Sequence, residues 1–317
     1  LYVQTDPPPL FTDTANGNYH LQDISPCIGA GIDSVEIDGT WYYAPDTDIE
    51  GNIRPNPEGS SPDMGAYEDS RALPIHSGPV YHVSTAGSDS TGTGSEQYPL
   101  ATIQKGIDSA SDGDTVLVAA GTYVENIFYD GKAIALGSLF MTTGDTSYIS
   151  QTIISGNGVE VVRFVDDEDA NSILEGFTLT NGGFGISLNG SSPVIKNVII
   201  TGNSDSGIYC TYSNPSISYS IIKNNSGWVA GGIDLSNSDP ILLNVLISDN
   251  TSSNATGCGG IYAINSNPVL QFVTITNNIH SAGENVGGIY VHYSNCTMTN
   301  SIIWNNNDVE FYIDDNS

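Results

Sequence analysis

The sequence predicts an all-β solenoid, in which short strands wind into stacked coils around one apolar column. The first observation is an internal repeat of five blocks, which start with Gly-Ile and carry the same residue types at the same offsets. The second is a strand-like alternation of apolar and polar residues inside each block. A period in the twenties, with a constant core and linkers of variable length, is typical of a solenoid. The blocks begin at Gly185, Gly207, Gly232, Gly260 and Gly288, and successive starts lie 22, 25, 28 and 28 residues apart.

The alternation favours strands over helices. One and three positions after the glycine the residues are apolar, as in Ile186 and Leu188 or Ile233 and Leu235, and the positions between them are polar or tyrosine. This is the period of a strand with one buried face. Pairs such as Ser-Pro, Asp-Pro and Gly-Gly bound the segments. We therefore expect two or three strands per coil of 22–28 residues, with coils stacked about 4.8 Å apart in parallel sheets.

Each block ends in an asparagine, eighteen residues after its glycine. A small side chain at a tight corner tolerates unusual backbone angles and can bond the turn backbone of its own or the next coil. We interpret these residues as a structural ladder and not as a ligand site. The ladder consists of Asn203, Asn225, Asn250, Asn278 and Asn306.

The stretch before the repeats predicts a capping helix. It reads YHVSTAGSDSTGTGSEQYPLATIQKGIDSASDGDTVLVAAGTYVENI. Ile103, Ile107 and Ala110 form an apolar stripe at helical spacing, which Ser111-Asp112-Gly113 ends. A strand is expected from Thr115 to Ala119. Such a helix can cover the open mouth of a solenoid.

This stretch resembles the start of secreted proteins of the pectate-lyase-like superfamily. The resemblance implies a single-stranded right-handed parallel β-helix over residues 80–317, with an N-terminal cap at 80–130 and coils at 131–317. Strand candidates ahead of the repeats are 133–136, 152–154, 159–165 and 177–180.

Residues 1–70 are irregular, β-rich and without a repeat, and 71–79 read as a linker. Two pieces, DPPPLFTDTANGNYHLQDISPCIGAG and DIEGNIRPNPEGSSPDMGAYE, resemble the segment that closes such a β-helix at its C-terminal end. Here that segment comes first. Either the chain is one period of a tandem array, or it is a subunit whose first segment completes the open end of a neighbouring copy. In either case copies join head to tail, and such contacts build fibres.

Composition excludes some partners. The chain of 317 residues has 7 Lys and Arg against 36 Asp and Glu, a net charge of −29, which argues against nucleic acid and anionic membranes. It has no apolar run of about 18 residues that could span a bilayer. With no signal peptide at Leu1, we expect a mature or excised segment. Few lysines and many Asn, Gly, Ser and Thr favour an extracellular or cell-surface location.

The four cysteines lack the spacing of zinc ligands. They are Cys27, Cys210, Cys258 and Cys296. Cys210 occupies an inward position and is expected to be a buried apolar residue.

The catalytic candidates are residues that resemble the active sites of the superfamily's enzymes. A shared fold does not by itself imply an activity. A polyuronate lyase needs a basic residue beside carboxylates that hold calcium, and Asp166, Asp167 and Lys196 resemble that arrangement. The alternative is a solvated acidic loop. Asp234 is the one acid at the outward second position of the five blocks, but the sequence offers no partner carboxylate for hydrolysis.

Ligand candidates are three tyrosines and two acidic loops. Tyr209, Tyr262 and Tyr290 share one offset, so they line one outer face, either as a sugar-binding surface or as a row that stacks on itself and stiffens the sheet. Calcium is the expected cofactor, since its oxygen ligands are present in both loops. The candidate metal ligands are Asp46, Asp48, Asp166, Asp167 and Asp169.

Two functions fit these observations. The first is an extracellular structural solenoid, a unit of a surface fibre or adhesin joined head to tail to copies of itself. The alternative is a secreted carbohydrate-active protein, either a calcium-dependent lyase or a polysaccharide binder.

Overall fold

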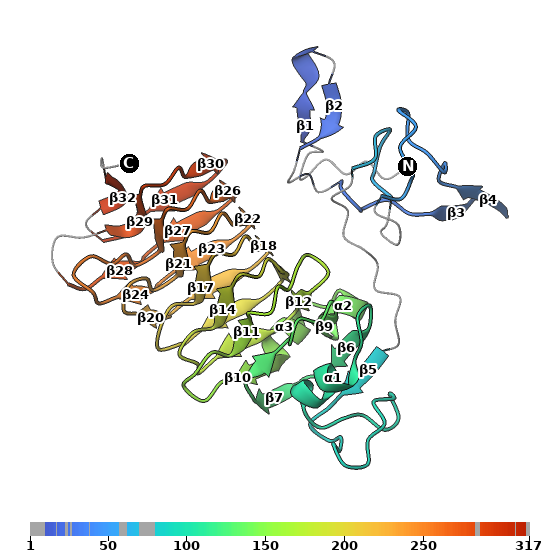
Figure 1. Ribbon diagram of the computed structural model, residues 1–317, viewed down its shortest axis with the longest axis horizontal. Coiled ribbons are helices and arrows are strands. Elements are labelled where there is room, and N and C mark those ends of the chain that lie inside the picture. Colours follow the sequence, from blue (N-terminus) through green and yellow to red (C-terminus); the bar gives the residue numbers. More distant parts are fainter. Residues whose placement is uncertain are drawn as a thin grey trace. The chain divides into compact units, whose positions relative to one another are not determined.

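The computed structural model describes residues 10–16, 18–22, 25, 27–37, 39–56, 62–69, 80–282, 286–307 and 309–314. The chain divides into two compact units, Leu1–Ser77 and Gly78–Ser317. The second unit is a stack of coils (Figure 1). The linker expected at 71–79 lies outside the described residues.

Three long parallel sheets run along the described part of the second unit, and from β6 onward each coil contributes one strand to each sheet. Sheet one contains β5 (Val80–Val83), β6 (Thr115–Val118), β9 (Ala135–Ser138), β12 (Ile173–Glu175), β15 (Val194–Lys196), β18 (Ser216–Ser218), β22 (Ile241–Leu243), β26 (Val269–Gln271) and β30 (Thr297–Thr299). Sheet two contains β7 (Gly121–Val124), β10 (Thr152–Ser155), β13 (Thr178–Thr180), β16 (Ile199–Thr201), β19 (Ile221–Lys223), β23 (Leu246–Ser248), β27 (Thr274–Thr276) and β31 (Ile302–Trp304). Sheet three contains β8 (Ile127–Phe128), β11 (Val162–Phe164), β14 (Ile186–Asn189), β17 (Ile208–Thr211), β21 (Ile233–Ser236), β25 (Ile261–Ile264), β29 (Val286–His292) and β32 (Val309–Asp314).

The apolar positions of the repeat face inward, as the alternation predicts. In sheet three Ile208 pairs with Ile233, and Cys210 with Leu235. All four side chains are fully buried in one continuous column. Each buried aliphatic side chain of this size stabilises the fold by about 1.5–3 kcal/mol. The glycine before each strand is needed because a Cβ at Gly232 would collide with the next coil's backbone.

The five asparagines at the block ends form a hydrogen-bonded ladder in the structure. The side-chain oxygen of Asn225 accepts hydrogen bonds from both the backbone and the side-chain nitrogen of Asn203, at 3.1 and 2.9 Å. The same pair of bonds recurs at each step as far as Asn306. The unusual backbone angles belong to the preceding residue: Asn224 and Asn277 have φ of 55° and 57°. At each corner, one residue therefore adopts the left-handed backbone conformation, and the asparagine after it makes the hydrogen bonds to the next coil.

The predicted capping helix is α1 (Ile103–Ser109), with Ile103 and Ile107 fully buried against the first coils. Side chains of those coils cap both ends of the helix. The carboxylate of Glu125 accepts the N–H groups of Ile103 and Gln104, and Lys132 Nζ donates to carbonyls at the other end. The segment 80–130 also supplies the first strands of all three sheets.

Two short helices and one small sheet were not predicted. Helices α2 (Phe140–Thr143) and α3 (Ser147–Gln151) lie between β9 and β10, in a segment without a strand candidate. The growing linkers of the last coils form a small parallel sheet of β20 (Ser226–Gly227), β24 (Thr251–Ser252) and β28 (Ile279–His280). These elements are too short to show an apolar period. Within the described ranges, every helix is too short or too polar to cross a bilayer.

The first unit is irregular and β-rich. Strands β1 (Phe11–Asp13) and β2 (Asn18–Leu21) pair across the short helix η1 (Thr14–Asn16), and β3 (Ser34–Ile37) pairs with β4 (Thr40–Tyr43). Among the described residues of this unit, Leu21 is the one buried apolar side chain, while Trp41 and Tyr43 are exposed. Polar contacts must therefore hold it together.

Candidate functional site

One row of side chains crosses the outer face of sheet three. It is formed by the second position of the last four repeats, on β17, β21, β25 and β29, and by the residue in register with them on β32. The row joins the three tyrosines singled out in the sequence to the acid Asp234 and to a fourth tyrosine outside the repeats. In order it reads Tyr209, Asp234, Tyr262, Tyr290 and Tyr312.

Most of the aromatic rings in this row stack on each other. Tyr262 and Tyr290 have ring centroids 4.9 Å apart at an angle of 15°, and Tyr290 and Tyr312 are 5.3 Å apart at 18°. Tyr209 stacks on Phe184 at 5.1 Å. Both faces of Tyr290 are thus covered by neighbouring rings, which stiffens the sheet.

Asp234 interrupts the aromatic row. It lies on β21 between Tyr209 and Tyr262, and its carboxylate makes no hydrogen bond or ion pair with the described residues. Burial, with the charge of Asp205 adding to it, raises the pKa of Asp234 to about 7. Burial and the charge of Asp234 likewise raise the pKa values of both flanking tyrosines. A half-buried acid without a partner is a candidate functional group.

A loop brings a second acid toward this point. The carboxylate of Asp205 accepts the backbone N–H groups of Ser206 at 2.9 Å and Trp228 at 3.3 Å, which fixes its position. Trp228 itself is 63% exposed on the adjacent linker. Sequence reasoning missed Asp205 because it lies in a linker of variable length, outside the repeated offsets.

The acidic loop at 166–169 is organised by Glu168, the one acid in it that the sequence did not suggest as a metal ligand. Glu168 is buried and accepts bonds from the N–H groups of Gly131 and Asp166 and from the Ser191 hydroxyl. Lys196 pairs with Glu175 at 3.2 Å on neighbouring strands of sheet one. The lysine that the lyase hypothesis needs as a base is therefore already engaged.

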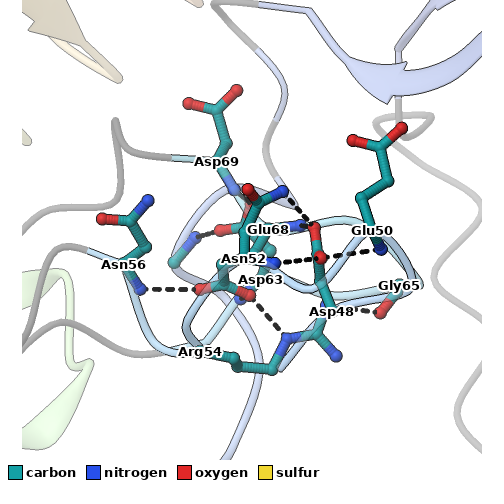
Figure 2. Close-up of polar contacts among 10 residues, drawn as sticks. Asp48, Glu50, Asn52, Arg54, Asn56, Asp63, Gly65, Glu68 and Asp69 are labelled. Carbon is teal, nitrogen blue, oxygen red and sulfur yellow. Dashed lines mark hydrogen bonds and ion pairs between the residues drawn. The ribbon is translucent and has the colours of Figure 1, made fainter. Parts of the chain in front are cut away.

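Figure 2 shows the polar network of the first unit, which contains Asp48, one of the two remaining metal candidates. Asp48 accepts the N–H groups of Glu50, Asn52 and Glu68 and the side-chain amide of Asn52, at 2.8–3.0 Å. Burial alone would raise the pKa of Asp48, but these bonds hold it well below the usual range. The donors occupy the lone pairs that a calcium ion would use. Asp46 contributes a backbone carbonyl to the same loop, accepting from Arg54.

A buried ion pair lies at the centre of this network. Arg54 Nε lies 2.6 Å from Glu68 Oε2, and their side chains are 7% and 0% exposed. Glu68 also accepts the N–H groups of Asn56 and Asp63. Burial, together with the charges of Glu68 and Asp69, raises the pKa of Asp63 to about 6. Such a network replaces the apolar core that this unit lacks.

The four cysteines are free thiols. Cys210 is fully buried on its inward position, and burial raises its pKa well above the usual range. Over the described ranges no three His, Cys, Asp or Glu side chains converge in a way that would hold a metal ion.

The sequence was compared with known families and structures. Residues 106–272 match the family described as "Right handed beta helix region". No curated protein matches the chain significantly. A pectin methylesterase from Aspergillus niger is similar at 14% identity over 70% of this chain and 86% of that one, with a TM-score of 0.45. Pectate lyase Pel9A is similar at 14% identity over 71% and 78%, with a TM-score of 0.37.

These structural likenesses are too distant to bear on activity. The family match has a different weight, because it spans more than half of the chain and coincides with the three parallel sheets. The protein belongs to the right-handed β-helix family.

Proposed function

We propose that the protein binds a polysaccharide on the outer face of sheet three, at the interruption of the aromatic row by Asp234. The observation that carries the proposal is that, among the described residues, the two tyrosines beside Asp234 each have a stacked ring on one face. Tyr209 is covered by Phe184 and Tyr262 by Tyr290. Both covering rings lie away from β21, so the remaining faces flank Asp234.

The chemistry of this surface suits a sugar. Pyranose rings pack their C–H groups on aromatic faces, while a carboxylate and phenol hydroxyls fix orientation through hydrogen bonds. The exposed Trp228 and the loop that carries Asp205 lie beside the same strands. An extracellular or cell-surface location, as composition suggested, agrees with such a ligand.

Affinity electrophoresis in gels that contain soluble glycans tests the proposal. Tyr262→Ala removes one flanking face and should weaken retardation by about tenfold in Kd, which corresponds to about 1.4 kcal/mol. Tyr98→Ala removes a tyrosine that is 58% exposed on the cap, away from this surface, and should change nothing. Equal retardation of both variants, or no retardation of the parent by any glycan, would contradict the proposal.

A polysaccharide lyase is a second candidate, supported by the resemblance of residues 81–127. It would place calcium at Asp166, Asp167 and Asp169, or at Asp46 and Asp48. The engagement of Lys196 by Glu175 argues against it. An absorbance assay for unsaturated uronates, run with calcium and then with chelator, tests it: a chelator-sensitive signal lost in Lys196→Ala would establish lyase activity.

Head-to-tail assembly into a fibre or adhesin also stays a prediction. Within the described residues β30, β31 and β32 end their sheets, and each has one edge without a partner strand. Such edges pair readily with another chain. Electron microscopy of the purified protein would show filaments with a regular axial repeat, and isolated rods would refute the assembly.

A further inference from the structure

We propose that this surface selects a cationic glycan, whose ammonium group lies on Asp234 between the rings of Tyr209 and Tyr262. The inference rests on the proposed function and names its ligand class: an amino sugar with a free or alkylated amine.

The spacing of the strands sets the size of the guest. Tyr209 and Tyr262 lie two strands apart, with Asp234 on the strand between them, so their rings are about 9.6 Å apart at the usual strand spacing. A layer of atoms in contact with both rings needs about 7–8 Å between them, because each contact distance is about 3.5–4 Å. The gap therefore accommodates one layer of atoms, such as an ammonium group or the edge of a pyranose ring.

The charges favour a cation. Asp234 has no partner among the described residues, and the carboxylate of Asp205 adds negative charge nearby. A half-buried carboxylate without compensation costs free energy that an incoming ammonium group would recover. The flanking phenol rings add cation–π attraction on two sides. With 7 basic against 36 acidic residues in the chain, a polyuronate would be repelled.

A metal ion is a poorer occupant of this site. Calcium takes six to eight oxygen ligands, while this surface offers two carboxylates, and the described residues contain no cluster of three metal-ligating side chains. Aromatic faces attract weakly hydrated organic cations and do not replace the oxygen ligands of a hard ion.

The test compares two probes of equal length and linkage: oligomers of N-acetylglucosamine, which are neutral, and oligomers of glucosamine whose amines are trimethylated, which carry a permanent positive charge. Isothermal titration calorimetry should give at least about tenfold tighter binding of the cationic oligomer. Asp234→Asn should bring the ratio of the two affinities close to one, because any other effect of the substitution acts on both oligomers alike. Asp249→Asn removes one exposed charge elsewhere, at a left-handed position that asparagine tolerates, and should preserve the preference.

The pH dependence gives a second readout. The groups that face Asp234 are Asp205, Tyr209 and Tyr262. As pH rises through about 7, Asp234 ionises, so affinity for the permanent cation should increase relative to affinity for the neutral oligomer.

The outcomes separate the two proposals. If neither oligomer nor any other glycan binds, the proposed function fails. If both oligomers bind equally and Asp234→Asn has no effect, the cationic ligand is refuted and glycan binding stands. Displacement of the cationic oligomer by calcium, but not by sodium at equal ionic strength, would assign the carboxylates to a metal and also overturn the inference.

Discussion

Removing one rung of the asparagine ladder tests how the coils are held together. Asn250 is fully buried and its side chain makes four hydrogen bonds. Its oxygen accepts from the backbone and side-chain nitrogens of Asn225. Its nitrogen donates to the carbonyl of Ile222 and the side-chain oxygen of Asn278, at 3.0 and 2.9 Å.

The cost of Asn250→Ala follows from the groups left behind. The backbone N–H of Asn225 loses its acceptor and the carbonyl of Ile222 loses a donor, both in the buried interior. Each unsatisfied buried group costs about 1–3 kcal/mol, so the variant should lose about 2–6 kcal/mol.

Urea unfolding followed by circular dichroism measures this loss, with the m-value as a check on cooperativity. The matched control is Asn189→Ala, because Asn189 is exposed on β14 and its side chain makes no hydrogen bond with the described residues. The control should stay within about 0.5 kcal/mol of the parent. Equal midpoints for the two variants would refute the view that the ladder bonds stabilise the stack.

Three further outcomes are expected. Ile247→Asp places an unpaired charge in the fully buried column, and urea unfolding should show a loss above about 4 kcal/mol; unchanged stability would contradict the inward assignment. Glu68→Gln leaves Arg54 buried without its counter-ion, at a cost of about 3–5 kcal/mol, so limited proteolysis should cut the first unit before the second. Asp63, 4% exposed, has a pKa raised from 3.8 to about 6. The folded state therefore holds this proton more tightly than the unfolded state, and the first unit should lose at most about 3 kcal/mol as pH rises from about 4 to 6. Hydrogen exchange at the backbone amides of the first unit measures that loss of stability. The substitution Asp63→Asn should abolish its pH dependence.

The repeating part of the fold was predictable because its cause is local. Alternation of apolar and polar residues decides which side chains of a short strand face inward, as Ile233 and Leu235 show. The recurring asparagine indicates a corner. Its constant offset from the glycine places each copy at the same position within its coil. The capping helix was readable for the same reason, since Ile103 and Ile107 are one turn apart.

The candidate site depended on contacts that have no period. Asp234 was visible as an acid at an outward position, but its isolation and the approach of Asp205 from a variable loop came only from the packed coils. The structure also joined Tyr312 to the row through the register of β32. In the first unit, the sequence suggested Asp48 as a metal ligand, whereas the tertiary structure surrounds it with N–H donors.

The order of apolar and polar residues decides which positions are buried in each strand. The amino-acid sequence alone therefore determined that this protein is a stack of parallel-stranded coils. Which aromatic rings stack, and which described carboxylate has no partner, depends on side chains from different coils and from loops of unequal length. Only the tertiary structure decided these, because stacking and charge pairing act between groups that are close in space and more than twenty residues apart in sequence.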